Sequence, residues 1–205
     1  MHDHDHDHAP IRDAHAPTVY ERRAHAIETL LIDRGIVTAD EVRRGIETLD
    51  SKTPAQGARV VARAWADPAF KTRLLADAKS AVKELGLDPG ASTVLRAVEN
   101  TNQVHNLIVC TLCSCYPRSL LGVPPDWYKG LGYRSRAVVD PRGVLKEFGL
   151  EPGPEVEVRV YDSTADIRYL VIPARPAGTE RLTEEELAGL VTRDSMIGVA
   201  RARTS

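Results

Sequence analysis

The three cysteines of this chain, Cys110, Cys113 and Cys115, lie within six residues of a 205-residue sequence. Cysteines this close together cannot link distant elements by disulfide bonds, and their number is odd. The pattern therefore argues against a disulfide framework. Thiolates are soft ligands that suit zinc, copper(I), iron and cobalt. A Cys-x-x-Cys-x-Cys run lets the backbone curl until three sulfurs face one point. The cluster therefore predicts a metal site on one short segment, which we call the claw (residues 110–115).

Two simpler interpretations of the cluster are a zinc knuckle and three buried, inert cysteines. A knuckle needs a fourth ligand, and the sequence has no second cysteine pair. His105 precedes Cys110 by five residues, but on a strand its side chain shares a face with Val109 and not with Cys110. Buried cysteines are common, yet chance burial rarely places three of them so close together. We therefore prefer a metal claw.

The backbone of the claw supplies further candidate ligands. Ser114 stands between two cysteines, so its amide and that of Cys115 lie close to any ion that both sulfurs bind. A strongly Lewis-acidic trivalent ion could displace these amide protons. The site would then hold three sulfurs and two backbone nitrogens and keep one position open. An open position distinguishes a catalytic metal from a structural one.

The composition is that of an ordinary globular protein, with 42% hydrophobic and 27% charged residues. The net charge of −2 favours neither nucleic acid nor an anionic membrane as a partner. No apolar run reaches the roughly 18 to 20 residues of a membrane span. The polar, histidine-rich start is not a secretory signal. These features favour a reducing cytoplasm as the compartment.

Residue patterns divide the chain into three parts. Residues 1–17 have no hydrophobic period and are expected to form a disordered arm, whose alternating His and Asp are either a solvated tail, a tag or a loose metal ligand. Residues 18–90 are expected to be helical, and residues 91–205 to form a mixed α/β domain that binds the metal. The expected fold class is α+β: a helical N-terminal segment followed by a layered α-β-β-α domain that carries the claw.

Helix-capping residues and alternating apolar patterns locate the expected helices and strands. Capping boxes are expected where three helices begin, at Thr18 with Glu21, Thr38 with Glu41, and Thr183 with Glu186. Asp67 caps a helix, or two in succession, that runs to Gly86, and Asp140 caps a short helix. Residues 94–100 and 104–110 are β-rich. Residues 155–163 and 166–173 alternate, and the DSTA turn between them predicts a β-hairpin.

Several segments resemble the α subunit of nitrile hydratase, over about residues 18 to 199: VCTLCSC, LGVPPDWYK, YRSRAVV, RPAGT and VTRDSMIGV. In that family, Thr at the position of Thr111 accompanies non-corrin cobalt and Ser accompanies iron. The resemblance thus implies about one Co(III) per chain, bound by Cys110, Cys113, Ser114 and Cys115. It also implies hydration of a nitrile to an amide, with either water or a sulfenate oxygen as the nucleophile.

The same resemblance implies that Cys113 is oxidised to the sulfinic acid and Cys115 to the sulfenic acid, while Cys110 stays a thiolate. In the family, arginines of a β subunit, present as one chain or split into two, hold these oxygens, and an accessory protein helps to load cobalt. Within this chain, Arg168 is a candidate neighbour of the oxidised sulfurs. A solvated strand arginine is the alternative for Arg168.

Arg118 departs from the family pattern, in which an aromatic Trp after CSCYP lines the pocket. A guanidinium there would make the pocket cationic. Arginine at this place resembles the metal-bearing γ subunit of thiocyanate hydrolase, whose substrate is an anion. It would also suit a polar or bulky nitrile, as in toyocamycin nitrile hydratase, or it could face an acid or a partner subunit. We expect the catalytic groups to be Cys113, Ser114, Cys115 and Arg118.

The sequence thus predicts an enzyme, the metal-bearing α subunit of a nitrile hydratase (a hydro-lyase), which acts on a small nitrile together with a β-type subunit. A γ-type subunit of thiocyanate hydrolase is the first alternative. A metal carrier or structural metal subunit is the second. Bound cobalt with oxidised cysteines would indicate the enzyme, whereas reduced thiols that exchange zinc would indicate a carrier.

Overall fold

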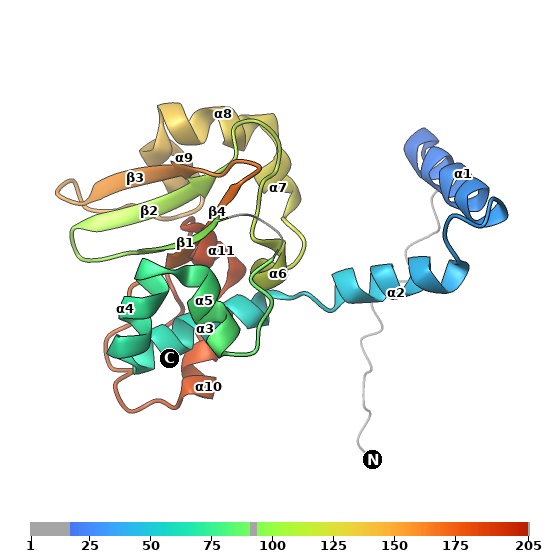
Figure 1. Cartoon of the computed structure of the whole chain (residues 1–205). Helices are drawn as coiled ribbons and strands as arrows, with labels where there is room; N and C mark the ends of the chain where they lie inside the picture. The colour runs from blue at the N-terminus through green and yellow to red at the C-terminus, as the bar shows by residue number, and fades with distance from the viewer. Residues whose placement is uncertain (1–16, 91–93, 205) are drawn as a thin grey trace, which may run out of the picture. The chain divides into compact units, whose positions relative to one another are not determined.

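A computed structural model describes residues 17–90 and 94–204 of the chain, and Figure 1 shows its elements. The chain divides into two compact units, Met1–Glu47 and Thr48–Ser205. The arm expected over residues 1–17 lies outside the described residues, except for Pro17. Among the residues described, no helix is both long enough and apolar enough to cross a membrane.

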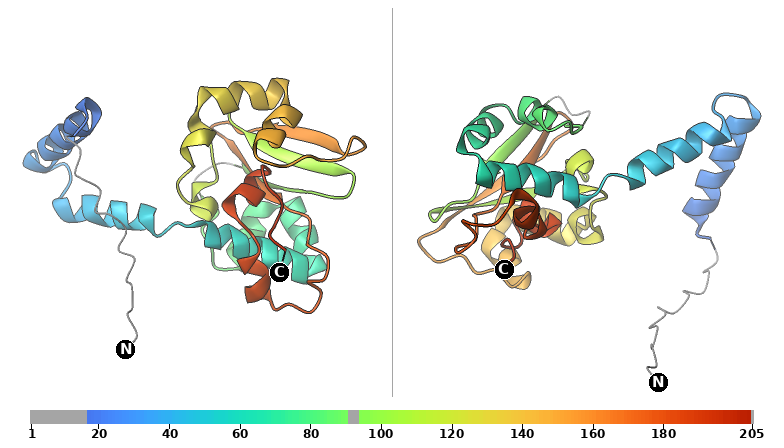
Figure 2. Two further views of the ribbon diagram at one scale, coloured as in Figure 1. Left: turned by 180° about the vertical axis from the view of Figure 1, so that it is seen from behind. Right: turned by 90° about the horizontal axis from the view of Figure 1, so that it is seen from below.

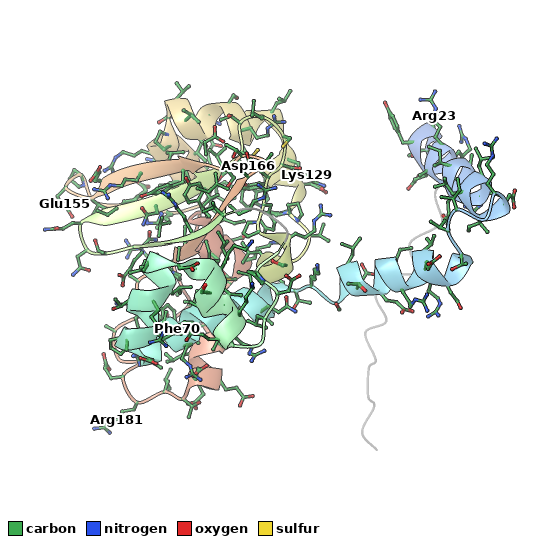
Figure 3. All side chains as sticks on the ribbon, in the orientation of Figure 1. Arg23, Phe70, Lys129, Glu155, Asp166 and Arg181 are labelled. Carbon is green, nitrogen blue, oxygen red and sulfur yellow. The ribbon has the colours of Figure 1, made fainter. Side chains whose placement is uncertain are left out.

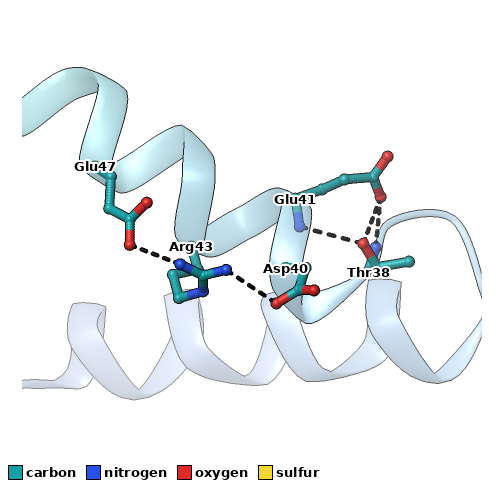
Figure 4. A network of polar contacts seen from close by, with 5 residues as sticks. All are labelled: Thr38, Asp40, Glu41, Arg43 and Glu47. Atoms are coloured by element: carbon teal, nitrogen blue, oxygen red, sulfur yellow. Dashed lines mark hydrogen bonds and ion pairs between the residues drawn. The ribbon is translucent and has the colours of Figure 1, made fainter.

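The first unit contains α1 (Val19–Asp33) and the greater part of α2 (Ala39–Asp50). The predicted capping box of α1 is present, with the Thr18 amide 2.6 Å from Glu21 Oε2. At the start of α2, the Thr38 amide and hydroxyl both donate to Glu41 Oε2 at 2.8 Å, as Figure 4 shows. Neither helix has a buried residue, so their apolar side chains, such as Ile27, remain exposed.

The second unit contains the remaining helices and all the strands of the described chain. Its helices are α3 (Pro54–Ala66), α4 (Pro68–Ala76), α5 (Ala78–Glu84), α6 (Arg118–Leu121), α7 (Asp126–Lys129), α8 (Leu131–Val139), α9 (Pro141–Glu147), α10 (Glu184–Gly189) and α11 (Arg193–Ile197). Asp67 caps α4 as predicted. The Asp77 carboxylate accepts from the Ser80 amide and starts α5, so the segment up to Gly86 forms two helices. Asp140 and Thr183 cap α9 and α10 as predicted.

The strands are β1 (Val94–Glu99), β2 (Val104–Val109), β3 (Glu157–Asp162) and β4 (Ile167–Ile172). β1 pairs with β4, and β2 pairs with β3; both pairs are parallel. The predicted hairpin between β3 and β4 is therefore wrong, because these neighbouring strands enter different sheets. Alternation identifies a half-buried strand but carries no information on its partner, which here lies across a long connection.

The two strand pairs are stacked between helices, which confirms the predicted α-β-β-α layering (Figures 1 and 2). α4 and α5 pack on β1, while α8 packs on β2 and α9 on β3. Contacts of β2 with β1 and β4 join the two sheets. Phe70 of α4 is buried in the core, whereas Lys129, Glu155 and Arg181 are exposed at the periphery (Figure 3).

Candidate metal centre

The claw follows β2 directly and brings its three sulfurs together. Cys110 and Cys115 are buried and Cys113 is exposed, and all three are free thiols. The Sγ atom of Cys113 lies 3.7 Å from that of Cys110 and 3.3 Å from that of Cys115. All three ligand atoms lie within 4.8 Å of one another. The structure thus juxtaposes the three sulfurs that the sequence predicted as ligands.

Parallel pairing of β2 with β3 places an acid beside the start of the claw. Val109 is in register with Asp162, the last residue of β3. The carboxylate of Asp162 accepts from the Thr111 amide at 2.9 Å and from the Thr111 hydroxyl at 2.5 Å. Thr111, which the family resemblance links to cobalt, is therefore hydrogen-bonded to an acid that lies 51 positions away in the chain.

Side chains of α7 and α8 also hold the backbone of the claw. From α8, Arg134 donates from Nε to the Cys110 carbonyl (3.0 Å) and from Nη2 to the Thr111 carbonyl (2.7 Å). From α7, the Tyr128 hydroxyl donates to the Cys115 carbonyl at 2.9 Å. Arg134, Tyr128 and Asp162 were not predicted from the sequence. Two of them lie in segments that resemble the family, Arg134 in YRSRAVV and Tyr128 in DWYK.

The environment of the thiols differs along the claw. Hydrogen bonding, first from the Cys115 thiol and then from the Ser114 amide, lowers the pKa of Cys113. Burial is the main cause that raises the pKa of Cys115, to about 12, and the hydrogen bond with Cys113 adds to it. Binding of a metal ion by all three sulfurs must therefore release protons, above all from the buried Cys115.

Arg168 and Arg118 lie in different settings. Arg168 is half-buried on β4, and its positive charge opposes the rise in the pKa of Cys115 that burial causes. Its Nη1 also donates to the carbonyl oxygens of Thr164, Ala165 and Ile167. Arg118 begins α6 and is exposed, and the described residues offer its guanidinium no hydrogen bond or ion pair. The roles expected for both arginines stay predictions.

Both ring nitrogens of His105 have hydrogen-bond partners outside the claw. Its Nε2 lies 2.7 Å from the Gly198 carbonyl, and its Nδ1 lies 3.3 Å from Asn100 Nδ2. Gly198 has a φ of +97°, and a Cβ there would collide with the Asn106 carbonyl, so glycine allows this close approach. Among the described residues, the cluster of potential ligands at the claw consists of the cysteines alone. A zinc knuckle with His105 as its fourth ligand is thus excluded.

Acid is expected to destabilise the chain through His105. Burial lowers the pKa of this ring, so it stays neutral in the folded chain at pH values where the unfolded chain binds a proton. The free energy of unfolding should therefore fall as the pH drops below about 6.5, and level off below the lowered pKa of the folded state. Urea unfolding between about pH 8 and pH 5 checks this. His105→Gln should flatten the slope, whereas His25→Gln, on exposed α1, should keep it; equal slopes would contradict the expectation.

A separate cavity of about 520 Å³ lies at the opposite ends of β2 and β3 from the claw. Asn100, His105 and Arg175 contribute to its wall. The hydrogen-bonding groups of these side chains are engaged within the protein, since Arg175 donates to Thr179 and to the Trp65 carbonyl. The claw, in contrast, lies at an open surface, where Leu112 is 77% exposed.

Known proteins resemble this chain over most of its length. The family model described as nitrile hydratase, alpha chain, matches residues 18–200. The α subunit of the low-molecular-weight cobalt-containing nitrile hydratase of Rhodococcus rhodochrous is 54% identical over 179 residues, which cover 87% of this chain and 86% of that protein. The cobalt-containing α subunit from Pseudonocardia thermophila is 51% identical over an alignment that covers 88% of this chain and 90% of that protein. The γ subunit of thiocyanate hydrolase from Thiobacillus thioparus is 41% identical, with coverages of 85% and 76%.

Solved structures agree with these sequence relationships. A double mutant of the Fe-type nitrile hydratase from Comamonas testosteroni Ni1 superposes with a TM-score of 0.86 and 43% identity, covering 93% of each chain. A recombinant thiocyanate hydrolase with partially modified cobalt centres gives a TM-score of 0.87 and 39% identity, covering 92% of each chain. Identity above 50% to cobalt-containing α subunits, together with three converging cysteine sulfurs, settles the relationship: the chain belongs to the family of nitrile hydratase α chains.

Proposed function

We propose that this chain is the metal-bearing α subunit of a cobalt-dependent nitrile hydratase, which converts a nitrile to the corresponding amide in the cytoplasm. The observation that carries the proposal is the convergence of three cysteine sulfurs within 4.8 Å, in a chain 54% identical to a cobalt-containing α subunit. Soft sulfur donors fit cobalt, and Thr111 is the residue that accompanies cobalt in the family. The sulfurs of Cys110, Cys113 and Cys115 and the backbone nitrogens of Ser114 and Cys115 would hold about one Co(III) per chain.

Oxidation of two cysteines is part of the proposal. Cys113 would carry a sulfinic acid and Cys115 a sulfenic acid, with dioxygen as the oxidant, while Cys110 stays a thiolate. The exposure of Cys113 and the burial of Cys115 are compatible with a more extensive oxidation of Cys113. Arg168, whose charge lowers the pKa of Cys115, is the residue of this chain proposed to stabilise an anionic oxygen there.

In the reaction, an oxygen atom joins the nitrile carbon and two protons finish on the nitrogen. When bound, cobalt supplies Lewis-acid activation of the nitrile or of water. Two nucleophiles fit the claw: water, and the sulfenate oxygen of Cys115. Asp162 is the carboxylate in contact with the claw, but its oxygens already accept from Thr111 at 2.9 and 2.5 Å. We therefore assign the general base to the partner subunit.

A β-type partner, as one chain or two, would cover the open side of the claw. Leu131 and Val138 share the face of α8 that carries Arg134, and they are 75% and 52% exposed. α1 and α2 also lack buried residues. Apolar surface of this kind favours a protein interface. Cobalt would be loaded with the help of an accessory protein.

Elemental analysis of the mature chain, from cells supplied with cobalt, is expected to find about one cobalt per chain. Mass spectrometry should show roughly 48 Da of added oxygen, from three oxygen atoms on two cysteines. The peptide with residues 110–115 should carry all of it. Iron or zinc at that level would overturn the cobalt assignment. Reduced thiols that exchange zinc in the mature protein would favour the metal-carrier alternative.

Thiocyanate hydrolysis is the second candidate activity, and Arg118 is the observation that favours it. This exposed guanidinium, free of hydrogen bonds and ion pairs to the described residues, lies three residues after Cys115. A cationic group there would attract an anionic substrate. Assays with acrylonitrile and thiocyanate on the reconstituted complex distinguish the two activities.

A further inference from the structure

The first peptide plane of the claw is hydrogen-bonded at both ends. In a trans peptide the carbonyl and the N–H point in opposite directions. In the peptide that joins Cys110 to Thr111, the carbonyl accepts from Arg134 Nε at 3.0 Å and the N–H donates to Asp162 Oδ1 at 2.9 Å. Two oppositely charged side chains, one from α8 and one from the end of β3, therefore restrict rotation of this plane.

The next peptide plane is held by the same guanidinium. Arg134 Nη2 donates to the Thr111 carbonyl at 2.7 Å, so one rigid, planar group binds two successive carbonyl oxygens. A lysine could supply its charge but not this fork of donors. At the far end of the claw, Tyr128 holds the Cys115 carbonyl. The segment between these points contains Leu112 and Cys113, which are both exposed.

We infer that Arg134 is a positioning residue that sets the backbone of the claw for cobalt before the metal arrives. The inference rests on the proposed function of the claw as a cobalt site. The orientation of the first two peptide planes determines where the Cys110 sulfur points relative to the turn that follows. A loop ordered in advance loses less conformational entropy when it binds, so its affinity is higher. Arg134 acts through the backbone and is not a ligand.

The experiment compares Arg134→Lys with Arg136→Lys in the full-length, metal-free chain. Arg136 lies on the same helix, but its guanidinium pairs with Glu147 at 2.6 and 3.0 Å and, within the described part of the chain, makes no hydrogen bond to the claw. Each protein is titrated with Co(II) while the sulfur-to-cobalt absorption is followed. Arg134→Lys is expected to lower the cobalt affinity about ten- to a hundredfold, which is the usual effect of losing a group that orients metal ligands. Arg136→Lys should bind like the unchanged chain.

Thermal unfolding separates this role from a merely structural one. The two variants should unfold at similar temperatures, so that the loss of affinity belongs to Arg134→Lys alone. Equal cobalt affinities in the two variants would overturn the inference and leave the proposed function intact. Absence of cobalt from the mature chain, produced with its loading protein in cells supplied with cobalt, would instead overturn the proposed function.

A second measurement needs no variant. If the claw is set in advance, the Thr111 amide, bonded to Asp162, should exchange slowly with deuterium in the metal-free chain. Exchange as fast as that of an unstructured peptide would overturn the inference, even if Arg134→Lys failed to fold.

Discussion

Without a β-type partner, the cobalt-loaded chain is expected to hydrate acrylonitrile at least roughly a hundredfold more slowly than the reconstituted complex. The reason is geometric. Cys113 and Leu112 are exposed, so this chain alone neither excludes water from the claw nor positions a substrate against it. Asp162, the acid beside the claw, already accepts two hydrogen bonds from Thr111, which tie it to the backbone of the claw. The values of kcat/KM for the chain alone and with its partner check this expectation.

The comparison needs equal loading in both preparations. Cobalt content and the oxygen mass on residues 110–115 must agree, because a preparation with less metal would be slower for that reason alone. With loading matched, a chain that works alone at the rate of the complex would show that the pocket is complete without a partner.

Arg118→Trp is expected to change substrate preference in the complex by about ten- to a hundredfold. A hydrogen bond to a charged group contributes about 1.5 to 3 kcal/mol, which corresponds to that range of selectivity. If the Arg118 charge faces the pocket, the tryptophan variant should favour small apolar nitriles and lose activity towards thiocyanate. The ratio of kcat/KM for acrylonitrile to that for thiocyanate measures the change.

Arg118→Lys serves as the matched control, because it keeps the positive charge and should retain most of the preference for an anion. If Arg118 instead faces the partner subunit, Arg118→Trp should weaken assembly and leave the ratio unchanged. An unchanged ratio with intact assembly would contradict both roles and make Arg118 a solvated charge.

The helix caps show which features of the fold can be predicted from neighbouring residues alone. The caps expected at Thr18, Asp67, Asp140 and Thr183 are all present, because a cap depends on residues within one turn of the helix start. Helices α6, α7, α8 and α11 were not predicted. Three of them, α6, α7 and α11, have only four or five residues, too few for a hydrophobic period to show. Helix α8 has nine residues but buries only Tyr133 and Ala137, so its apolar pattern is weak.

The convergence of three sulfurs at the claw could be predicted from the sequence by itself, because Cys110, Cys113 and Cys115 lie within six residues of one another. The pairing of the strands was decided only by tertiary structure, since β3 and β4 are neighbours in sequence yet belong to different sheets. The residues that hold the backbone of the claw were likewise brought to it only by the tertiary structure. Arg134 is 24 positions from Cys110, and Asp162 is 51 positions from Thr111. Packing of α8 and parallel pairing of β2 with β3 place them there, and neither contact leaves a periodic signal in the chain.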